Sequence, residues 1–230
     1  MNAASLHPLK ESLRVGLQPQ NILIPCHSGF LQGELTLPPD ATGIVIFMHG
    51  SGAYRFRNCC IARALNSSGL GTLILNVLPF EEAITPETAK LESDVDLLYR
   101  QLLSTLHWID NDNFFASLHK GFFGSSTEIE TMVRVAGELD MNINVLVFRG
   151  GQTEFQEKAF IGVNDPTLFI VGKKEEEIPG LYKTLFSELS CKTSLELMHH
   201  AGYFFGESCS LENMSALTVK WFCHFLASHS

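Results

Sequence analysis

The residues of this sequence best suited to chemistry lie in one stretch, residues 120–133, which reads KGFFGSSTEIETMV. An apolar run bounded by Gly121 and Gly124 indicates a buried strand, and apolar residues then recur at helical spacing from Ile129 onward. Ser126 falls at the junction. A strand-to-helix turn of this kind, the nucleophile elbow, holds a serine hydroxyl exposed and leaves the next N–H free to receive an oxyanion. We therefore predict Ser126 as a nucleophile.

The elbow pattern is Gly-x-Ser-x-Gly, and residues 124–128 match it except at the last position. The N–H of Thr127 would be one donor to the oxyanion. Glu128 stands where glycine is expected. Its side chain is expected to crowd the turn, and its negative charge would oppose an oxyanion.

An uncharged serine needs a base within hydrogen-bond reach and a carboxylate that orients the base. Glu175 follows an apolar run at 167–171, and His199 and His200 follow another at 194–198. The order serine, acid, histidine is that of one family of hydrolase triads. A solvated charged loop around Glu175, and a histidine pair at a strand end with one ring packed and the other in solvent, are the structural alternatives.

A second landmark is the apolar run at 43–48, GIVIFM, which is typical of a strand buried on both faces. It ends in His49-Gly50-Ser51-Gly52. We expect His49 to shape this loop through hydrogen bonds, and the N–H of Ser51 or Gly52 to be the second oxyanion donor.

Strands and helical segments alternate along the chain. A hairpin is predicted around 27–29 and a helix closed by Gly69. The best-defined amphipathic helix has Thr85 as its N-cap and Pro86 at its first helical position. The expected strands are 21–25, 30–37, 43–48, 72–78, 121–124, 142–148, 167–171 and 194–198, and a closing helix covers 211–225. This alternation predicts an α/β fold: a mostly parallel sheet with helices on both faces, an N-terminal hairpin, and ligands bound at the carboxyl ends of the strands.

Composition limits the function classes. The formal net charge is −9 and the pI is about 5.4, which argues against a nucleic-acid-binding surface. Six cysteines without a C-x-x-C pair indicate reduced thiols and no zinc site. No run approaches a membrane span, and the N-terminus lacks a secretory pattern, so a cytoplasmic location is expected. Residues 1–20 are interpreted as an extension and 21–230 as one domain.

Several segments together resemble the dienelactone hydrolase-like branch of the α/β-hydrolase superfamily. The matches are the loop at 49–52, the elbow at 123–127, the strand and acid loop at 169–172, the loop at 201–205, and Trp221-Phe222 in the closing helix. The similarity covers roughly residues 43–226. It implies an α/β-hydrolase fold with a Ser-acid-His site and no cofactor or metal.

The resemblance fails at the histidine. The family's histidine loop places its catalytic histidine at Tyr203, and a phenol with a pKa near 10 is not a ready base at neutral pH. His199 or His200 would have to serve from three or four residues upstream, which is roughly 10 Å at strand rise unless the loop folds back. Glu175 in place of aspartate is a tolerable change.

Three interpretations follow. In the first, Ser126 attacks a small ester, thioester or lactone, with His200 as base and Glu175 as its orienting acid. In the second, the triad is inactive, and a cleft lined by His49, Glu128, Tyr203 and Phe204 binds a ligand or protein. The third keeps the fold for chemistry not built on Ser126. Ser126→Ala separates the first two, because only the hydrolase needs the hydroxyl. The sequence does not indicate the oligomeric state.

Overall fold

A computed structural model describes most of the chain. The described residues are 15–26, 29–49, 52–77, 94–125, 128–138, 141–150, 160, 162–172, 192–198 and 208–226, with side chains omitted at 49, 52–54 and 208–209. Within them the strands form one sheet of eight strands in the order β1-β2-β4-β3-β5-β6-β7-β8. The strands are β1 Gly16–Cys26, β2 Gly29–Leu37, β3 Gly43–His49, β4 Gly71–Asn76, β5 His119–Ser125, β6 Val145–Arg149, β7 Thr167–Gly172 and β8 Thr193–Met198.

The sheet is mixed. β1 and β2 form an antiparallel hairpin, and β2 is antiparallel to β4. From β4 to β8 every neighbouring pair is parallel. Both the predicted hairpin and the mostly parallel sheet are therefore confirmed.

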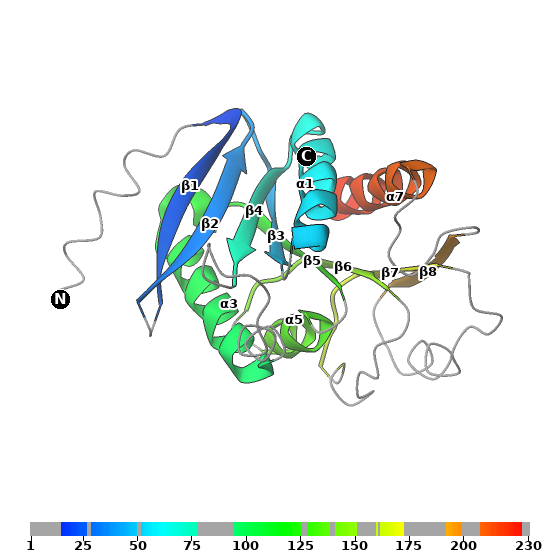
Figure 1. Cartoon of the computed structure of the whole chain (residues 1–230). Coiled ribbons are helices and arrows are strands. Elements are labelled where there is room, and N and C mark those ends of the chain that lie inside the picture. Colours follow the sequence, from blue (N-terminus) through cyan, green and yellow to red (C-terminus); the bar gives the residue numbers. More distant parts are fainter. Residues whose placement is uncertain are drawn as a thin grey trace.

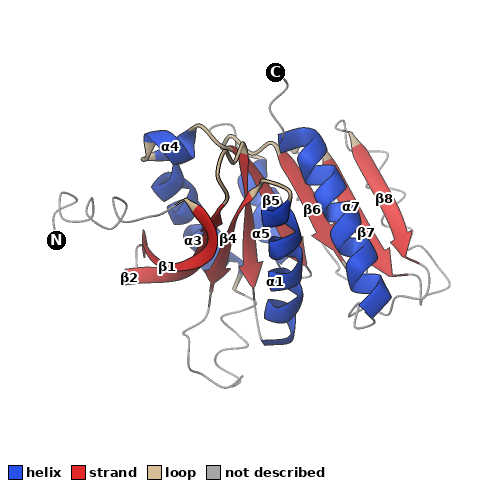
Figure 2. Ribbon diagram, turned by 90° about the horizontal axis from the view of Figure 1, so that it is seen from above, coloured by secondary structure: helices blue, strands red, loops and turns tan. Residues whose placement is uncertain are grey.

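Helices cover both faces of the sheet (Figures 1 and 2). On one face lie α1 Gly52–Ser67 and α7 Ser208–Leu226, and on the other lie α3 Val95–Asp110 and α5 Glu128–Ala136. A single-turn helix, α4 Asn113–Ala116, follows α3. The helices on each face pack against one another as well as against the strands.

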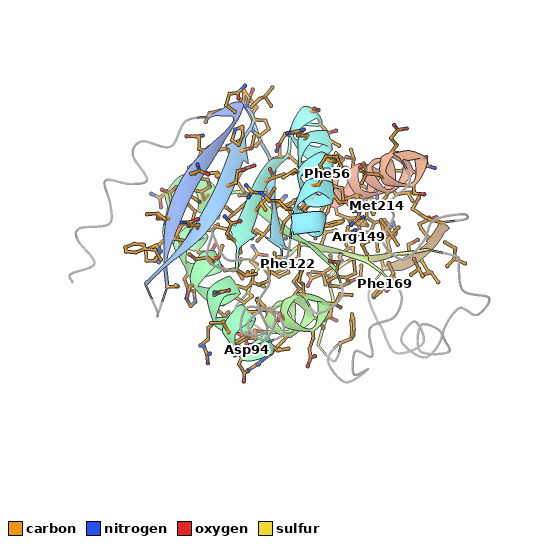
Figure 3. The ribbon with its side chains drawn as sticks, viewed as in Figure 1. Phe56, Asp94, Phe122, Arg149, Phe169 and Met214 are labelled. Atoms are coloured by element: carbon orange, nitrogen blue, oxygen red, sulfur yellow. The ribbon has the colours of Figure 1, made fainter. Side chains whose placement is uncertain are left out.

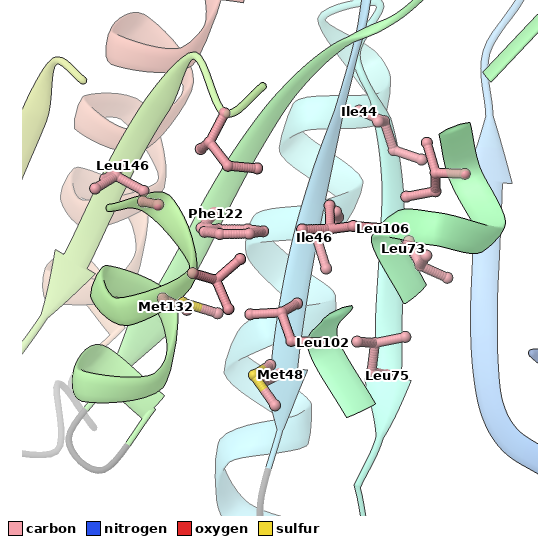
Figure 4. Close-up of a cluster of buried hydrophobic side chains, with 14 of the residues drawn as sticks. Ile44, Ile46, Met48, Leu73, Leu75, Leu102, Leu106, Phe122, Met132 and Leu146 are labelled. Atoms are coloured by element: carbon pink, nitrogen blue, oxygen red, sulfur yellow. The ribbon is translucent and has the colours of Figure 1, made fainter. Parts of the chain in front are cut away.

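The core is divided by the sheet into two layers. Alternate residues of each strand point to opposite faces, so Phe122 packs in the layer under α3 and α5, and Phe123 in the layer under α1 and α7. Figure 4 shows the first layer, where Leu102 and Leu106 of α3 meet Ile46 of β3. In the second layer the rings of Phe47 and Phe123 lie 5.1 Å apart. Because β3 and β5 are packed on both faces, their positions are fixed where they approach the site.

The hairpin is longer than the sequence predicted. β1 begins at Gly16, so residues 16–20, interpreted as part of an extension, belong to the sheet. The segment GLQPQ contains glycine, proline and polar residues, which do not indicate a strand. It is tolerated because β1 is an edge strand, and its pairing with β2 is irregular between Gly16 and Gln20.

The ends of α1 and α3 agree only in part with the sequence prediction. The predicted closure of α1 is confirmed: Gly69 has a φ of 84°, and the N–H groups of Gly69 and Leu70 donate to the carbonyls of Asn66 and Leu65. α1 nevertheless begins at Gly52, the last residue of the predicted loop at 49–52, which is earlier than expected. In α3 the N-cap is Asp94, whose side chain accepts from the N–H of Leu97. The start predicted for this helix, at Thr85-Pro86, was therefore too early, and residues 85–86 themselves lie outside the described residues.

Candidate active site

The candidate site begins where β3 and β5 part. These two strands are paired from Gly43 opposite His119 to Phe47 opposite Phe123, and no further. β3 remains paired with β4 through His49, and β5 remains paired with β6 through Ser125. The sheet therefore splits at the carboxyl ends of two strands whose connections run in opposite directions. In α/β sheets, ligands bind at such a switch point.

The backbone groups released by this split are bound by side chains. The N–H of His119 donates to the carbonyl of Thr42, the residue before β3. Every second N–H of β5 therefore points toward β3, and a continued ladder would pair the N–H of Ser125 with the carbonyl of Met48. Instead, the Met48 carbonyl accepts from the Nδ2 of Asn58 at 3.4 Å, and the Ser125 N–H donates to Glu128 Oε2 at 2.8 Å. Two side chains thus replace one bond of the ladder and hold the split open.

Glu128 is bound tightly at the elbow. The Ser125 hydroxyl also donates to Glu128 Oε2, at 3.3 Å, and Glu128 is only 8% exposed. The bond from the Ser125 N–H back to a glutamate three residues later is one half of a capping box, Ser-x-x-Glu, which satisfies an amide at a helix start. Rather than projecting across the turn, the side chain folds back onto Ser125. The carboxyl group therefore lies beside the last residue of β5.

Close packing of α5 on β5 requires Gly124. A Cβ at this position would lie 2.5 Å from the sulfur of Met132 and 3.6 Å from the Cβ of Glu128. Met132 is fully buried. The first glycine of the elbow pattern is therefore needed for contact between helix and strand.

Arg149 is a buried cation on the next strand. It pairs in register with Ser125, is 2% exposed, and shares a sheet face with Val145 and Val147, which pack under α7. Figure 3 shows its position relative to Met214 of α7. Arg149 thus places a charged group in an otherwise apolar layer of the core, where burial is costly without polar partners.

The structure describes few of the predicted site residues. Gly52 is the first residue of α1, where helix amides have no acceptor within the helix, and this fits a donor role. The backbone of His49 ends β3, and Glu128 begins α5. The remaining predicted residues lie outside the described part of the chain, and their roles stay predictions: Ser51, Ser126, Thr127, Glu175, His199, His200, Tyr203 and Phe204.

Sequence reasoning missed two site features. The Ser125-x-x-Glu128 pattern is a recognised helix-start signal, but it was considered only as a departure from the elbow pattern. Asn58 sits on the buried face of α1 between apolar residues, and a polar residue at such a position is a signal that a buried group needs a partner. Its other amide atom, Oδ1, is enclosed and makes no hydrogen bond within the described residues.

Other reactive groups in the described part of the chain lie away from this split. Burial raises the pKa of the Cys59 thiol, as does the charge of nearby Glu34, and burial likewise raises the pKa of Cys223. Both cysteines are thus poorer nucleophiles than an ordinary thiol at neutral pH. No group of three potential metal ligands occurs among the described residues. None of the helices there is long and apolar enough to cross a membrane.

Comparison with solved structures supports the architecture. A dienelactone hydrolase from Anabaena variabilis is 29% identical, with a TM-score of 0.78 over 91% of this chain and 99% of that one. An α/β serine hydrolase homologue from Coxiella burnetii is 18% identical, with a TM-score of 0.68 over 90% and 98%. A lidless α/β serine hydrolase from Xanthomonas campestris is 16% identical, with a TM-score of 0.69 over 95% and 100%. The chain therefore has the α/β-hydrolase fold.

Sequence comparison finds relatives whose names differ from those of the solved hydrolases. Two Mycobacterium tuberculosis proteins, provisionally named phosphoribosyl transferases, are each 31% identical over 199 residues. The match covers 84% of this chain but 44% of each relative, so the chain spans less than half of their length. No family model matches the chain.

Proposed function

We propose that this protein is a serine hydrolase that acts on a small ester, thioester or lactone, with Ser126 as nucleophile. The observation that carries the proposal is the split between β3 and β5, because Ser126 directly follows the last residue of β5 at that split. The 29% identity to a dienelactone hydrolase along 91% of the chain supports the same reaction class. The provisional name of the mycobacterial relatives does not enter the proposal, because most of their length has no counterpart here.

The reaction would proceed by acyl transfer. The Ser126 hydroxyl adds to the acyl carbonyl while its proton passes to His200, and Glu175 orients the imidazole. The oxyanion accepts from the N–H groups of Thr127 and of Gly52 or Ser51. Collapse of this intermediate expels the alcohol or thiol, which takes the proton from His200. A water molecule then hydrolyses the acyl-serine by the same steps in reverse.

Covalent labelling by a fluorophosphonate probe tests this proposal without knowledge of the substrate. We expect stoichiometric labelling of the wild-type chain, measured as the intact mass, because an activated serine attacks the phosphorus as it attacks an acyl carbon. Ser126→Ala should lose all labelling, and His200→Ala should slow it roughly 10²-fold or more, since the base contributes by proton transfer.

Two controls make the result specific. His107→Ala removes an exposed histidine at the last turn of α3, away from the split, and should label at the wild-type rate. The labelling rate of His199→Ala, compared with that of His200→Ala, shows which of the two adjacent imidazoles acts as the base. Unlabelled wild-type protein with a normal thermal unfolding transition would contradict the hydrolase proposal.

A second candidate, a ligand-binding protein without hydrolytic activity, is favoured by one observation. Glu128 places a buried carboxylate beside the elbow, where a negative charge opposes the oxyanion of acyl transfer. In that case the cleft would bind its ligand equally well after Ser126→Ala. Equilibrium binding of a captured ligand to both proteins separates this candidate from the hydrolase.

A further inference from the structure

Asn58 is the first buried side chain along α1 among those that the structure describes. It is 2% exposed, whereas residues 55–57 before it are half-buried or exposed. Ile61 and Leu65, one and two turns later, lie in the core layer under α1. Within the described residues, the buried face of α1 therefore begins with an amide and continues with apolar side chains.

The side chain of Asn58 joins α1 to the end of β3. Its Nδ2 donates at 3.4 Å to the carbonyl of Met48, the residue before the last one of β3. α1 begins at Gly52, which is six residues, or about 9 Å of helix, before Asn58. The bond thus ties together the two ends of the short connection between β3 and α1. Because only residues 50–51 separate those ends, the distance between them limits the conformations of the connection.

Stability alone does not account for an asparagine at this position. The Oδ1 of Asn58 is enclosed and makes no hydrogen bond within the described residues, and the bond from Nδ2 is long. A buried amide that is only partly bonded costs free energy compared with an apolar side chain. Asn66, about two turns further along α1, gives the contrast, because its Nδ2 donates at 3.0 Å to both the carbonyl of Leu70 and the hydroxyl of Thr72. Asn66 is explained by the bonds that it makes, and Asn58 is not.

We propose that Asn58 is a positioning residue, which holds the start of α1 against the end of β3 so that the N–H of Gly52 or Ser51 keeps its place as an oxyanion donor. This inference rests on the proposed hydrolase function, because such a donor matters only if an oxyanion forms. Asn58 acts through the backbone and does not touch the substrate. A displaced donor weakens the transition state more than the bound substrate, so the covalent step is the one that slows.

Fluorophosphonate labelling at several probe concentrations tests this role, because it separates the rate constant of the covalent step, kinact, from the half-saturating concentration, KI. We expect Asn58→Ala to lower kinact roughly tenfold or more and to change KI by less than about twofold. Asn58→Leu, which fills the vacated space, should show the same loss. Asn66→Ala is the matched control: it removes a better-bonded amide from the same helix and should lower the melting temperature without lowering kinact. An unchanged kinact in either Asn58 variant, or an equal loss in Asn66→Ala, would overturn the proposal.

Hydrogen exchange separates failure of this inference from failure of the hydrolase proposal. If the wild-type chain is not labelled, the amide exchange of peptides that cover the end of β3 and the first turn of α1 decides. Exchange there that is roughly tenfold faster in Asn58→Ala, but not in Asn66→Ala, would support the positioning role without any chemistry at Ser126. Exchange that is unchanged in Asn58→Ala, or raised equally in Asn66→Ala, would overturn it.

Discussion

Lys120 carries an amine that is almost fully enclosed at the start of β5. Its side chain is 3% exposed, and its Nζ lies 2.8 Å from Oδ1 of Asp110, at the end of α3. We expect Asp110→Asn to lower the free energy of unfolding by about 1–3 kcal/mol, because the buried cation keeps only a neutral acceptor. Denaturant unfolding monitored by tryptophan fluorescence measures this change.

A solvent-exposed ion pair with the same nitrogen–oxygen distance is the control. Arg134 and Asp96 are also 2.8 Å apart, but their side chains are 47% and 70% exposed. Asp96→Asn should therefore change stability by less than about 1 kcal/mol. If both variants lose the same amount, burial is not the reason for the effect at Lys120.

Asp165 gives the protein a pH-dependent term. Burial raises the pKa of this carboxyl from 3.8 to about 6, so in the folded state its ionised form is disfavoured. The folded chain then binds the proton more strongly than the unfolded chain, and stability falls as pH rises from about 4 to about 6. Asp165→Asn should have the wild-type melting temperature near pH 4 and exceed it above pH 6.

The size of that effect is modest because the group is only half-buried and partly screened by solvent. A gain of about 2–4 °C above pH 6 corresponds to roughly 1 kcal/mol for a chain of this size. Thermal melts at several pH values follow it. A gain that is equally large at pH 4 would show that the pKa of Asp165 is not the cause.

At the scale of elements, the contact between α5 and β5 depends on Gly124. A Cβ there would approach the Met132 sulfur to 2.5 Å within a closed core, so one of the two must move. We predict that Gly124→Ala lowers the free energy of unfolding by about 1–3 kcal/mol. Gly16→Ala on β1, where nothing lies within 4 Å of the added Cβ, should have little effect.

Combining Gly124→Ala with Met132→Ala tests the stated cause. The second substitution removes the sulfur that the new Cβ meets, so the double variant should lose at least about 0.5 kcal/mol less than the sum of the two single losses. Additive losses in urea unfolding would mean that strain at Gly124 arises from another contact.

Across the whole molecule, the sheet was largely predictable from sequence. β3, β6 and β7 are continuous apolar runs because both of their faces are covered, and such runs are readable without tertiary information. β1 was predicted too short, since its first residues have no strand signal and are held only by pairing with β2. Local sequence patterns thus identify strands whose own residues are apolar and buried. They miss strand segments that are stabilised only by pairing with a neighbouring strand.

The candidate site was predictable to a smaller extent. Ser126 and Glu128 were singled out because the elbow is a local pattern of five residues; the structure describes Glu128, and the role of Ser126 stays a prediction. The role of Asn58 was not, because it depends on where β3 leaves β5, which is a property of two distant segments. The likeness to solved structures at 18% and 16% identity supports the fold alone, and the chemistry has to be argued from the site residues.

The measurement that tests the hydrolase account most directly is the position of the fluorophosphonate adduct. Trypsin should release residues 121–134 as one peptide, which contains both Ser125 and Ser126, and fragmentation by tandem mass spectrometry separates the two. Our account predicts the adduct on Ser126, because the hydroxyl of Ser125 is buried and bonded to Glu128. An adduct on Ser125, or on a residue outside this peptide, would contradict it.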